Sequence, residues 1–428
     1  MKISQRQSPV CRVALLHFSD VALTGGERMI LRLVRGLAGG PVTPILLTQS
    51  PTPLTAGAAK CGVKTRFVKG SHRLSAREGR ILEYSPWKIL LTLFDLVIYN
   101  LRLIRVLRRE QITVLWCSNI RSFLMAAVAA RLLHIPIVWN IWAERRFGKA
   151  TRTIYDLCLR AADIVVTEYV GQADGLFSPA LLKTHKGRLR TVYTGVDDEY
   201  YAYTGPGYTC PHHEPSTIVG CSRICAAKGL DDLISALDIL KRRGRRVKLN
   251  LVGAALTASD EVFHDALLRR IDALQLTSEV EICGWHDDVK PFLANADLFV
   301  SASLSDRTWT EGLPGAVREA QAMGLPVVAT DVGGTREAIA DGETGILVKA
   351  GNPTALADAV QDLLGQPDVL KRMAAAAKRR SRRLFTIDAY VTGYSQVFKS
   401  LLQPPMRSHT DGQADTPGDR CEEELPTC

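Results

Sequence analysis

An alternation of strand and helix patterns, repeated in two series along the chain, is the feature that most constrains its fold. Short β-branched runs in the first half are typical of buried strands: Arg12–Phe18, Thr43–Gln49, Ile112–Cys117, Pro136–Trp139, Asp163–Thr167 and Leu189–Tyr193. Between them lie amphipathic segments with a helical period, such as Glu27–Leu37, Ser122–Leu133 and Arg152–Ala161. Because strict alternation produces a parallel sheet covered on both faces, this half predicts a doubly wound α/β domain.

The same alternation starts again after residue 215. Its predicted strands are Ser216–Cys221, Val247–Val252, Val280–Cys283, Leu298–Ala302, Pro326–Thr330 and Gly345–Val348. A chain of 428 residues is too long for one ordinary core. The sequence therefore predicts an α/β protein of two doubly wound domains.

The borders of the two domains follow from composition. Asp197–Pro215 is rich in tyrosine, histidine, proline and glycine without periodicity, which is typical of a linker. Ile387–Leu402 is one more amphipathic helix, and the polar tail from Pro404 to Cys428 is predicted to be disordered. The predicted division is an N-terminal domain at 1–197, a linker at 198–215, a C-terminal domain at 216–385, a final helix at 386–403 and a tail at 404–428.

Positive charge is concentrated in the first half of the chain. Residues 1–200 contain 29 lysines and arginines against 14 aspartates and glutamates, whereas the remainder contains 25 against 30. A basic domain favours an anionic partner such as a bilayer surface or a lipid-linked diphosphate. We predict no nucleic-acid partner, because no nucleic-acid-binding module is recognisable. Solvated helix faces explain the same charges equally well.

The apolar stretch from Pro86 to about Leu107 is interrupted by charged residues such as Lys88, Asp95 and Arg102, so it is a poor membrane span. It is compatible with a helix that lies on a membrane surface. No targeting signal is recognisable at the N-terminus. We therefore expect a cytoplasmic protein, with peripheral association at the inner face of the membrane as an open alternative.

The ten cysteines stand singly in apolar runs, as at Cys117 and Cys158, and predict buried, reduced thiols. Cys210 with His212 and His213 is the one cluster that could suggest a metal, but it lacks a second ligand pair. A polar linker explains this cluster better. The sequence predicts neither a metal site nor a cofactor.

Ligands of open parallel sheets bind beyond the carboxyl ends of the strands, where several short motifs lie. Gly25-Gly26 follows the first strand and opens a helix, where backbone amides favour an anion, although such a pair is often only a turn. Arg223 and Lys228 follow the first strand of the second series and suit a diphosphate, although solvated surface cations look the same. Another glycine pair, Gly333-Gly334, precedes a helix.

The most informative motif begins at Glu311 and ends at Thr330. Pro314 suits the first turn of a helix, so Glu311 lies in the preceding loop and Glu319 about one turn into the helix. Backbone amides of Gly312–Gly315 would then face a ligand that the two carboxylates bracket, and carboxylates accept hydrogen bonds from sugar hydroxyls. Capping or ion pairing would explain Glu319, but it explains Glu311 and its glycines poorly.

The order of these motifs resembles family 4 of the retaining GT-B glycosyltransferases. The matching elements are Arg-x4-Lys at Arg223–Lys228, Glu-x7-Glu at Glu311–Glu319, a strand at Pro326–Thr330, Gly-Gly-x-x-Glu at Gly333–Glu337, Gly-Gly-Glu-Arg at Gly25–Arg28, Tyr193–Asp197 and Gly284-Trp285. The resemblance covers almost the whole chain except the tail. It implies two Rossmann-like domains that face each other across a cleft, with the final helix crossing back to the first domain.

The resemblance also implies a function. Such an enzyme moves a sugar, with retention and without a metal, from a nucleotide sugar (UDP favoured, GDP the alternative) to a glycan or lipid-linked acceptor in surface polysaccharide or glycoconjugate biosynthesis. Arg223 and Lys228 would hold the donor diphosphate, with Gly26 assisting from across the cleft. Glu311 would face the transferred sugar, and Glu319 the ribose. The candidate catalytic residues are Glu311, Arg223 and Lys228, and the candidate donor-binding residues are Gly25, Gly26, Asn140, Gly284, Gly312, Leu313, Pro314, Gly315 and Glu319.

One position departs from the family pattern. Many relatives carry a histidine just after the fifth strand of the first domain, but Val138–Glu144 contains none. Asn140 is the candidate to hydrogen-bond a sugar hydroxyl instead. Acceptor recognition would fall to first-domain loops at Ser71–Ser85 and Trp142–Lys149, whose sequences name neither the acceptor nor the linkage.

Two alternatives from other classes remain open. One is a GT-B phosphorylase or a sugar-nucleotide epimerase, which turnover without an acceptor would distinguish. The other is a sugar-nucleotide-binding protein that has lost its chemistry, since fold does not determine function. The presence of both cations and both carboxylates argues against the second alternative.

Overall fold

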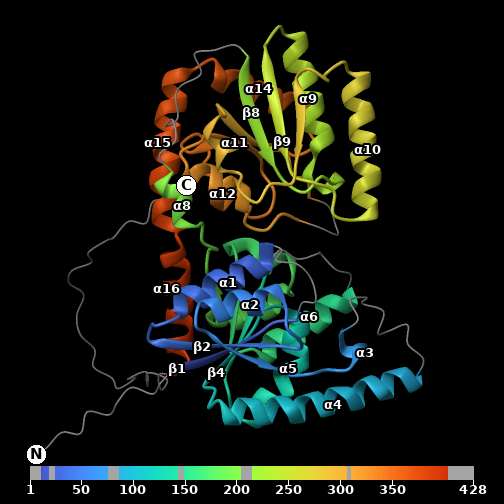
Figure 1. The fold of residues 1–428 in the computed structure, drawn as a ribbon, viewed down its shortest axis with the longest axis vertical. Helices are drawn as coiled ribbons and strands as arrows, with labels where there is room; N and C mark the ends of the chain where they lie inside the picture. The colour runs from blue at the N-terminus through green and yellow to red at the C-terminus, as the bar shows by residue number, and fades with distance from the viewer. Residues whose placement is uncertain are drawn as a thin grey trace, which may run out of the picture.

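The computed structural model of the protein describes residues 11–18, 25–75, 86–142, 149–203, 215–305 and 310–402. Two α/β domains are stacked one on the other, and each is built around a parallel sheet (Figure 1). The predicted fold class of two Rossmann-like, doubly wound domains is therefore confirmed.

The first domain contains a seven-stranded sheet in the order β3-β2-β1-β4-β5-β6-β7. Its strands are β1 (Cys11–Leu16), β2 (Val42–Thr48), β3 (Lys64–Phe67), β4 (Val114–Cys117), β5 (Ile137–Ile141), β6 (Ile164–Thr167) and β7 (Leu189–Thr191). Every neighbouring pair is parallel. The central strands β4 to β6 are buried along their whole length, which explains their continuous apolar sequences.

One strand of this sheet was not predicted. β3 has the sequence Lys-Thr-Arg-Phe and pairs only with β2 at the edge of the sheet. Its side chains are partly or fully exposed. An edge strand needs no continuous apolar run, so periodicity does not reveal it.

The second domain contains a six-stranded parallel sheet in the order β10-β9-β8-β11-β12-β13. Its strands are β8 (Ser216–Cys221), β9 (Val247–Val252), β10 (Val280–Gly284), β11 (Leu298–Ser301), β12 (Val327–Thr330) and β13 (Gly345–Val348). All six lie at their predicted positions, with ends that differ by one residue at most.

Helices cover both sheets. Those of the first domain are α1 (Gly25–Leu37), α2 (Pro53–Lys60), α3 (His72–Ser75), α4 (Pro86–Arg109), α5 (Ile120–Leu132), α6 (Lys149–Ala161) and α7 (Pro179–His185), with 3₁₀ turns η2 (Val170–Gly175) and η3 (Lys186–Arg188). The later ones are α8 (Asp198–Ala202), η4 (Ala226–Lys228), α9 (Leu230–Arg242), α10 (Ala258–Ala273), α11 (Lys290–Ala294), α12 (Gly315–Ala322), α13 (Thr335–Ala338), α14 (Pro353–Leu364), α15 (Pro367–Leu384) and α16 (Ile387–Ser400).

The predicted linker contains a short helix. α8 begins directly after Asp197 and buries Tyr200 and Tyr201 in one apolar layer of the second domain. Linker residues 204–214, with the Cys210, His212 and His213 cluster, lie outside the described residues, as does the whole predicted tail at 404–428. The absence of periodicity hid α8 because five residues are little more than one helical turn.

The last helix, α16, packs on the first domain. It contacts α1 and β1, and it buries Tyr390, Tyr394 and Phe398 among the apolar residues of that domain. In Figure 1, α15 and α16 follow one another along one side of the molecule and connect the two domains. Val196 also donates its backbone amide to the Phe385 carbonyl at 2.7 Å, where the chain passes between the domains.

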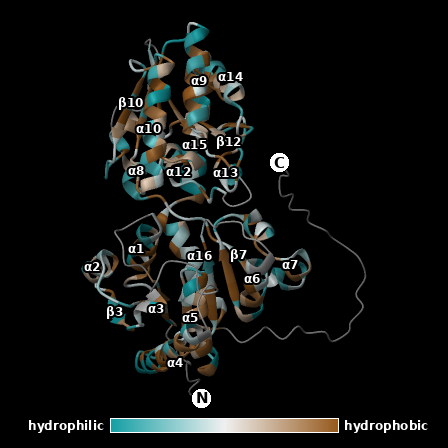
Figure 2. Cartoon of the chain, turned by 90° about the vertical axis from the view of Figure 1, so that its right-hand side faces the viewer, coloured by the Kyte–Doolittle hydropathy of each residue, from teal (hydrophilic) through white to brown (hydrophobic). Residues whose placement is uncertain are grey.

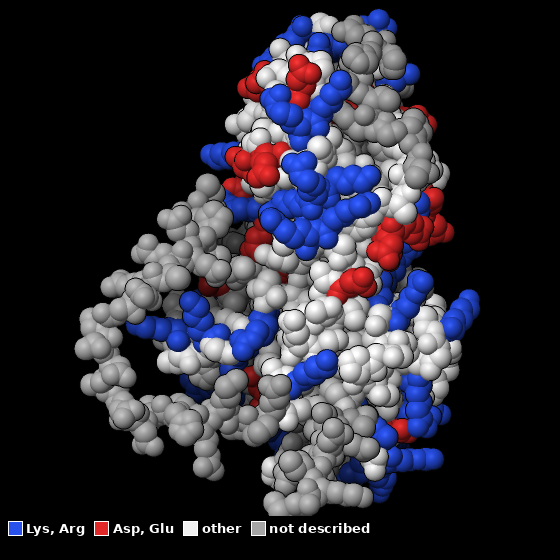
Figure 3. All heavy atoms as spheres, turned by 90° about the vertical axis from the view of Figure 1, so that its left-hand side faces the viewer, with Lys and Arg blue, Asp and Glu red and all other residues white. Residues whose placement is uncertain are grey.

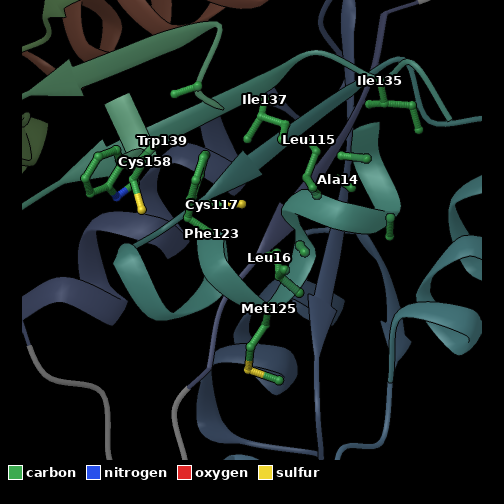
Figure 4. Packing of buried hydrophobic residues seen from close by; sticks show 14 of the residues in the cluster. Ala14, Leu16, Leu115, Cys117, Phe123, Met125, Ile135, Ile137, Trp139 and Cys158 are labelled. Atoms are coloured by element: carbon green, nitrogen blue, oxygen red, sulfur yellow. The ribbon is translucent and has the colours of Figure 1, made fainter. Parts of the chain in front are cut away.

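The apolar layers on the sheets have the composition that the sequence predicts. Figure 2 shows apolar strands inside and polar outer helix faces. Figure 4 shows the layer on one face of the first sheet, where Cys117 and Cys158 lie among Trp139, Phe123 and Leu16. All seven cysteines among the described residues are free thiols, and four of them are buried.

Positive charge is not confined to the first domain, although the first half of the chain has the net positive charge. α15 belongs to the half with a net negative charge, yet its sequence contains seven lysines and arginines. Figure 3 shows basic side chains gathered on the upper domain on the side where α15 lies. Of the helices within the described residues, none is both long and apolar enough to span a bilayer.

The attachment of α16 to the first domain can be tested with two tyrosines. The Tyr394 hydroxyl donates to Asn140 Oδ1, and both side chains are buried. Tyr394→Phe leaves this amide oxygen without its donor, so we expect a loss of about 1–3 kcal/mol in the free energy of unfolding by urea. Tyr390→Phe is the matched control, because its hydroxyl makes only a 3.5 Å contact to the Met29 carbonyl. Equal losses of unfolding free energy in the two variants would contradict the Tyr394–Asn140 hydrogen bond.

Candidate active site

A cleft of about 960 Å³ lies between the two domains. The first domain contributes residues that follow its strands, such as His17 after β1 and Glu168 after β6. The second domain contributes Trp285, after β10, and the start of α12. Because ligands of parallel sheets bind beyond the carboxyl ends of the strands, this cleft is the candidate active site.

The predicted site residues do not all line this cleft. Those that do are Gly25, Gly26, Glu311, Gly312, Leu313, Gly315 and Glu319. Those outside the lining are Asn140, Arg223, Lys228, Gly284 and Pro314. The structure thus brings together the first-domain glycine pair and the Glu311 motif from opposite sides.

Lys228 reaches the cleft through Glu311. The Lys228 ammonium lies 2.6 Å from Glu311 Oε2, and the Ser303 hydroxyl donates to the same oxygen at 2.7 Å. Ser303 and Glu311 are buried, and Lys228 is largely so. The sequence predicts a separate ligand for each of these two charges, whereas the structure shows that they contact one another directly.

Two glycines make this contact sterically feasible. Gly229 has a φ of +60°, and a β-carbon there would lie 2.0 Å from the Ala302 carbonyl oxygen. Gly333 has a φ of +53°, and its β-carbon would lie 1.8 Å from the Glu311 carbonyl oxygen. The Gly333-Gly334 motif is therefore explained by its packing beneath the Glu311 loop.

The Glu311 loop leads directly into α12. Pro314 is the N-cap residue, so the helix begins one residue later than the proline pattern predicts. Gly312, Leu313 and Gly315 line the cleft just ahead of and at the helix start. Free backbone amides at a helix N-terminus favour an anionic or strongly polar ligand.

Arg223 is held away from the Lys228–Glu311 contact. Its Nε lies 3.7 Å from the Asp260 carboxylate and donates to the Cys225 sulfur at 3.4 Å. Asp260 is buried, whereas the Arg223 side chain is about half exposed. To bind a ligand diphosphate, the Arg223 guanidinium would therefore have to leave Asp260 or to contact Asp260 and the diphosphate together.

Glu319 lies on α12 and faces a group of charges at the junction of the domains. Burial raises the pKa of its carboxyl group, although Arg32 and Arg318 act in the opposite direction. Arg32 donates from Nε to Asp197 at 2.9 Å. Arg318 donates to the Thr194 carbonyl oxygen, and burial lowers its pKa to about 10. Arg32 lies in no recognised motif and Arg318 is one of the unspecified positions between Glu311 and Glu319, so the sequence did not reveal their roles.

Gly26 is covered by an aromatic ring. A β-carbon at this position would lie 2.5 Å from the indole of Trp142, which also lines the cleft. The Trp142 indole in turn packs at 6.4 Å from the ring of Trp116. Close packing against tryptophan therefore accounts for this glycine in the structure, and its contact with a donor stays a prediction.

Asn140 does not line the cleft. It lies on β5, is 1% exposed, and accepts the hydrogen bond from Tyr394 of α16. Side chains alternate between the faces of a strand, so position along β5 did not reveal which way Asn140 points. Gly284 is also outside the lining, but its φ of +75° allows the turn that brings Trp285 into the cleft.

A buried hydrogen-bonded row on the first-domain side was not predicted. His17 Nδ1 lies 2.8 Å from the Ser118 hydroxyl, and His17 Nε2 lies 3.3 Å from Glu27 Oε1. All three side chains are buried, and His17 and Glu27 line the cleft. Gly-Gly-Glu-Arg at Gly25–Arg28 was the only sequence signal for this row.

Glu337, the last residue of the second glycine motif, connects the domains. Its carboxylate accepts the Val170 amide at 2.7 Å and the Tyr193 hydroxyl at 2.9 Å, both from the first domain. Its backbone carbonyl oxygen accepts from Arg380 at 2.8 Å. This carboxylate therefore has a structural role in joining the two domains.

The candidate acceptor loops are described only in part, because residues 76–85 and 143–148 lie outside the described residues. Among the residues that are described, no three histidine, cysteine, aspartate or glutamate side chains lie close enough together to hold a metal ion.

Comparison with known families assigns both domains. Residues 23–200 match the family model of Glycosyltransferase Family 4, and residues 215–366 match that of Glycosyl transferases group 1. Each of the two domains therefore matches a glycosyltransferase family model. This agrees with the family resemblance of the sequence motifs.

Similar curated proteins are also glycosyltransferases or related synthases. The chain is 33% identical over 195 residues to trehalose synthase from Pyrococcus horikoshii, covering 44% of this chain and 45% of that protein. It is 29% identical over 272 residues to alpha-D-kanosaminyltransferase from Streptomyces kanamyceticus, covering 61% and 63%. The chain therefore spans less than two thirds of the length of these curated relatives.

Solved structures share the fold of both glycosyltransferase domains together. A glycosyltransferase from Rickettsia africae superposes with a TM-score of 0.74 at 19% identity, covering 92% of this chain and 99% of that one. HepE from Anabaena, solved with UDP and glucose, gives a TM-score of 0.68 at 16% identity, covering 91% and 99%. The two domains therefore have the GT-B arrangement.

The packing beneath the Glu311 loop can be tested with two glycines. Gly333→Ala forces a β-carbon against the Glu311 carbonyl, whereas Gly351→Ala places one in open space at a similar φ of +70°. We expect Gly351→Ala to lower the free energy of unfolding by about 1–2 kcal/mol, the cost of the left-handed backbone alone. Gly333→Ala should lower the free energy of unfolding clearly more than Gly351→Ala does. Equal losses of free energy for the two variants in urea unfolding would contradict the close approach of Gly333 to the Glu311 carbonyl.

The charge state of Glu319 gives a pH-dependent prediction. Because its folded pKa is raised above the ordinary value of 4.5, the ionised carboxylate destabilises the folded state. This cost is absent below pH 4.5, grows as pH rises toward the folded pKa and is constant above it. Glu319→Gln should therefore have a higher Tm than the native protein at neutral pH, and the difference should vanish in acid. A Tm difference that does not change with pH would contradict the assignment.

Proposed function

We propose that this protein is a retaining glycosyltransferase that transfers a sugar from a nucleotide-sugar donor, with UDP as the favoured nucleotide. Its acceptor is a glycan or a lipid-linked saccharide in surface polysaccharide or glycoconjugate biosynthesis. The observation that carries the proposal is the Lys228–Glu311 contact at 2.6 Å, next to the amides that open α12 and opposite Gly25 and Gly26. This combination offers a cation, a carboxylate and free amides to one ligand.

The proposed donor roles follow from the chemistry of these groups. An ammonium has three hydrogen-bond donors, so Lys228 can keep its contact with Glu311 and still donate to a diphosphate oxygen. Arg223 is the second proposed diphosphate ligand. The cleft volume of about 960 Å³ is within the range of small-molecule sites. The complexes of the Anabaena fold relative with UDP and UDP-glucose support the choice of UDP.

The proposed sugar and ribose contacts use the two carboxylates of the motif. Glu311 has its second oxygen available to a sugar hydroxyl beside the donor phosphates, and Glu319 faces the ribose. Leu313 lines the same cleft. Gly284 and the neighbouring Trp285 are the proposed neighbours of the nucleobase.

The proposed reaction proceeds with retention and without a metal ion. The acceptor hydroxyl attacks C1 of the donor sugar on the face from which the diphosphate departs, the C1–oxygen bond to the diphosphate breaks, and the hydroxyl proton passes to the departing phosphate. Lys228 and Arg223 stabilise the negative charge that develops on the diphosphate, the role that a metal ion has in other transferases.

We propose a cytoplasmic location, at the inner face of the membrane where a lipid-linked acceptor is found. Relatives that act in surface glycan synthesis support this acceptor class, among them the lipopolysaccharide core glycosyltransferase LpsE of Rhizobium meliloti, 29% identical over 183 residues. The basic first half of the chain is the further support for an anionic, membrane-borne partner.

Donor binding is tested by a thermal-shift panel of UDP-, GDP- and ADP-sugars in the presence of EDTA. A ligand that binds only the folded state raises the apparent Tm, and we expect a UDP-sugar to give the largest shift without added metal. Lys228→Ala should abolish that shift, because a charge-assisted hydrogen bond contributes about 1.5–3 kcal/mol, or about ten- to hundredfold in affinity.

Lys241→Ala is the matched control for this experiment. Lys241 pairs with Glu279 at 2.8 Å, and unlike Glu311, the partner of Lys228, Glu279 does not line the cleft, so the loss of Lys241 should leave the shift unchanged. A full shift in Lys228→Ala would overturn the diphosphate assignment. Turnover of the donor by inorganic phosphate, or its isomerisation without an acceptor, would instead indicate a phosphorylase or an epimerase.

A further inference from the structure

The long helix α4 exposes an apolar face that no described residue covers. Its large apolar side chains with 40% or more of their surface exposed are Trp87, Leu90, Leu91, Leu93, Phe94, Val97 and Leu101. Most recur at intervals of three or four residues, which places them on one side of the helix. The opposite side is buried in the core of the first domain through Tyr99, Leu103 and Leu107.

Helix α5 extends this apolar face. Leu124, Val128 and Leu132 recur every four residues and are 48%, 54% and 64% exposed. The Asn100 side chain fastens α4 to α5, because it donates to the Met125 carbonyl at 3.0 Å and accepts the Ala129 amide at 2.9 Å. These two residues directly follow Leu124 and Val128 in sequence. We call this surface the α4–α5 face.

Basic side chains border the α4–α5 face. The exposed cations of α4 are Lys88, Arg102, Arg105, Arg108 and Arg109. The helix has one acidic residue, Asp95, whose carboxylate accepts from Arg73 at 2.8 Å and from Ser71 at 2.6 Å. The pKa of Asp95 is lowered by these hydrogen bonds, so it stays ionised and neutralised by its partner. The rim of the face is therefore positive.

An apolar helix face with a basic border has the chemistry of an interfacial helix, which inserts apolar side chains at the acyl boundary and places cations among lipid phosphates. A helix that exposes cations without apolar side chains does not have this chemistry. α15 contains seven lysines and arginines, but no large apolar side chain of that helix is exposed. Figures 1 and 2 show that α4 lies at the end of the first domain remote from the second domain.

We propose that the α4–α5 face docks on an anionic bilayer surface. The apolar rows enter the headgroup and upper acyl region, and the arginines at the end of α4 contact lipid phosphates. This docking proposal rests on the proposed membrane location of the protein. It names the α4–α5 face as the surface that binds the membrane. Because the face is remote from the cleft, loss of docking leaves donor binding intact.

The apolar part is tested by sedimenting the full chain with vesicles of equimolar phosphatidylcholine and phosphatidylglycerol at low salt. Phe94→Gln with Val97→Gln removes two exposed apolar side chains. We expect the partition coefficient for vesicle binding, calculated from the bound fraction, to fall at least about tenfold. Val262→Gln with Leu268→Gln is the matched control on α10, where both side chains are also exposed. Equal binding of the two double variants would overturn the proposal.

The electrostatic part uses a second pair of variants. Arg105→Gln with Arg108→Gln should weaken binding to the anionic vesicles by about fivefold per charge and leave the weak binding to pure phosphatidylcholine unchanged. Arg379→Gln with Arg383→Gln removes two exposed cations from α15 and should have no comparable effect. A larger loss in the α15 variant would assign docking to that helix and contradict the α4–α5 face.

Insertion itself is read from Trp87, which is 72% exposed. Brominated lipids should quench the tryptophan fluorescence of the native protein, and Trp87→Phe should lose that quenching. If the face instead pairs with a second copy of the chain, light scattering will show a dimer that Phe94→Gln with Val97→Gln dissociates, without vesicle binding by the native protein. That result would overturn the proposal. The nucleotide-sugar thermal shift, measured on the same variants, tests the proposed function separately.

Discussion

The contact between Lys228 and Glu311 is the interaction on which the second-domain side of the cleft depends. It joins the turn after β8 to the loop between β11 and α12, two segments about 80 residues apart in sequence. The contact requires Gly229 against the Ala302 carbonyl and Gly333 against the Glu311 carbonyl, because a β-carbon fits at neither position. Two glycines, one directly after Lys228 and one packed against the Glu311 carbonyl, therefore determine where those charges lie.

The first domain completes the cleft by its placement against the second. Glu337 binds Val170 and Tyr193, and the buried Arg318 donates to the Thr194 carbonyl oxygen. α16 adds a third connection, since its aromatic side chains are part of the first-domain core. With these contacts in place, the glycine pair at Gly25 faces the Glu311 loop across the cleft.

Much of the fold was predictable because buried parallel strands have continuous apolar sequences. β8, β9 and β13 begin and end at the predicted residues. The edge strand β3 and the short helix α8 were missed, since neither has a pattern long or apolar enough to detect. Site positions along the chain were predictable from motifs, but side-chain directions were not: Asn140 faces α16, and Lys228 faces Glu311. Directions depend on tertiary contacts that a single sequence does not contain.

We propose that the amides and charges around Glu311 hold a nucleotide sugar. Amide hydrogen exchange, measured with and without a saturating UDP-sugar, tests it most directly. We expect slower exchange at Glu311–Ala316 and at Cys225–Gly229, because ligand hydrogen bonds protect the amides of these segments. Donor binding that protects neither segment, with slower exchange confined to the first domain, would contradict it.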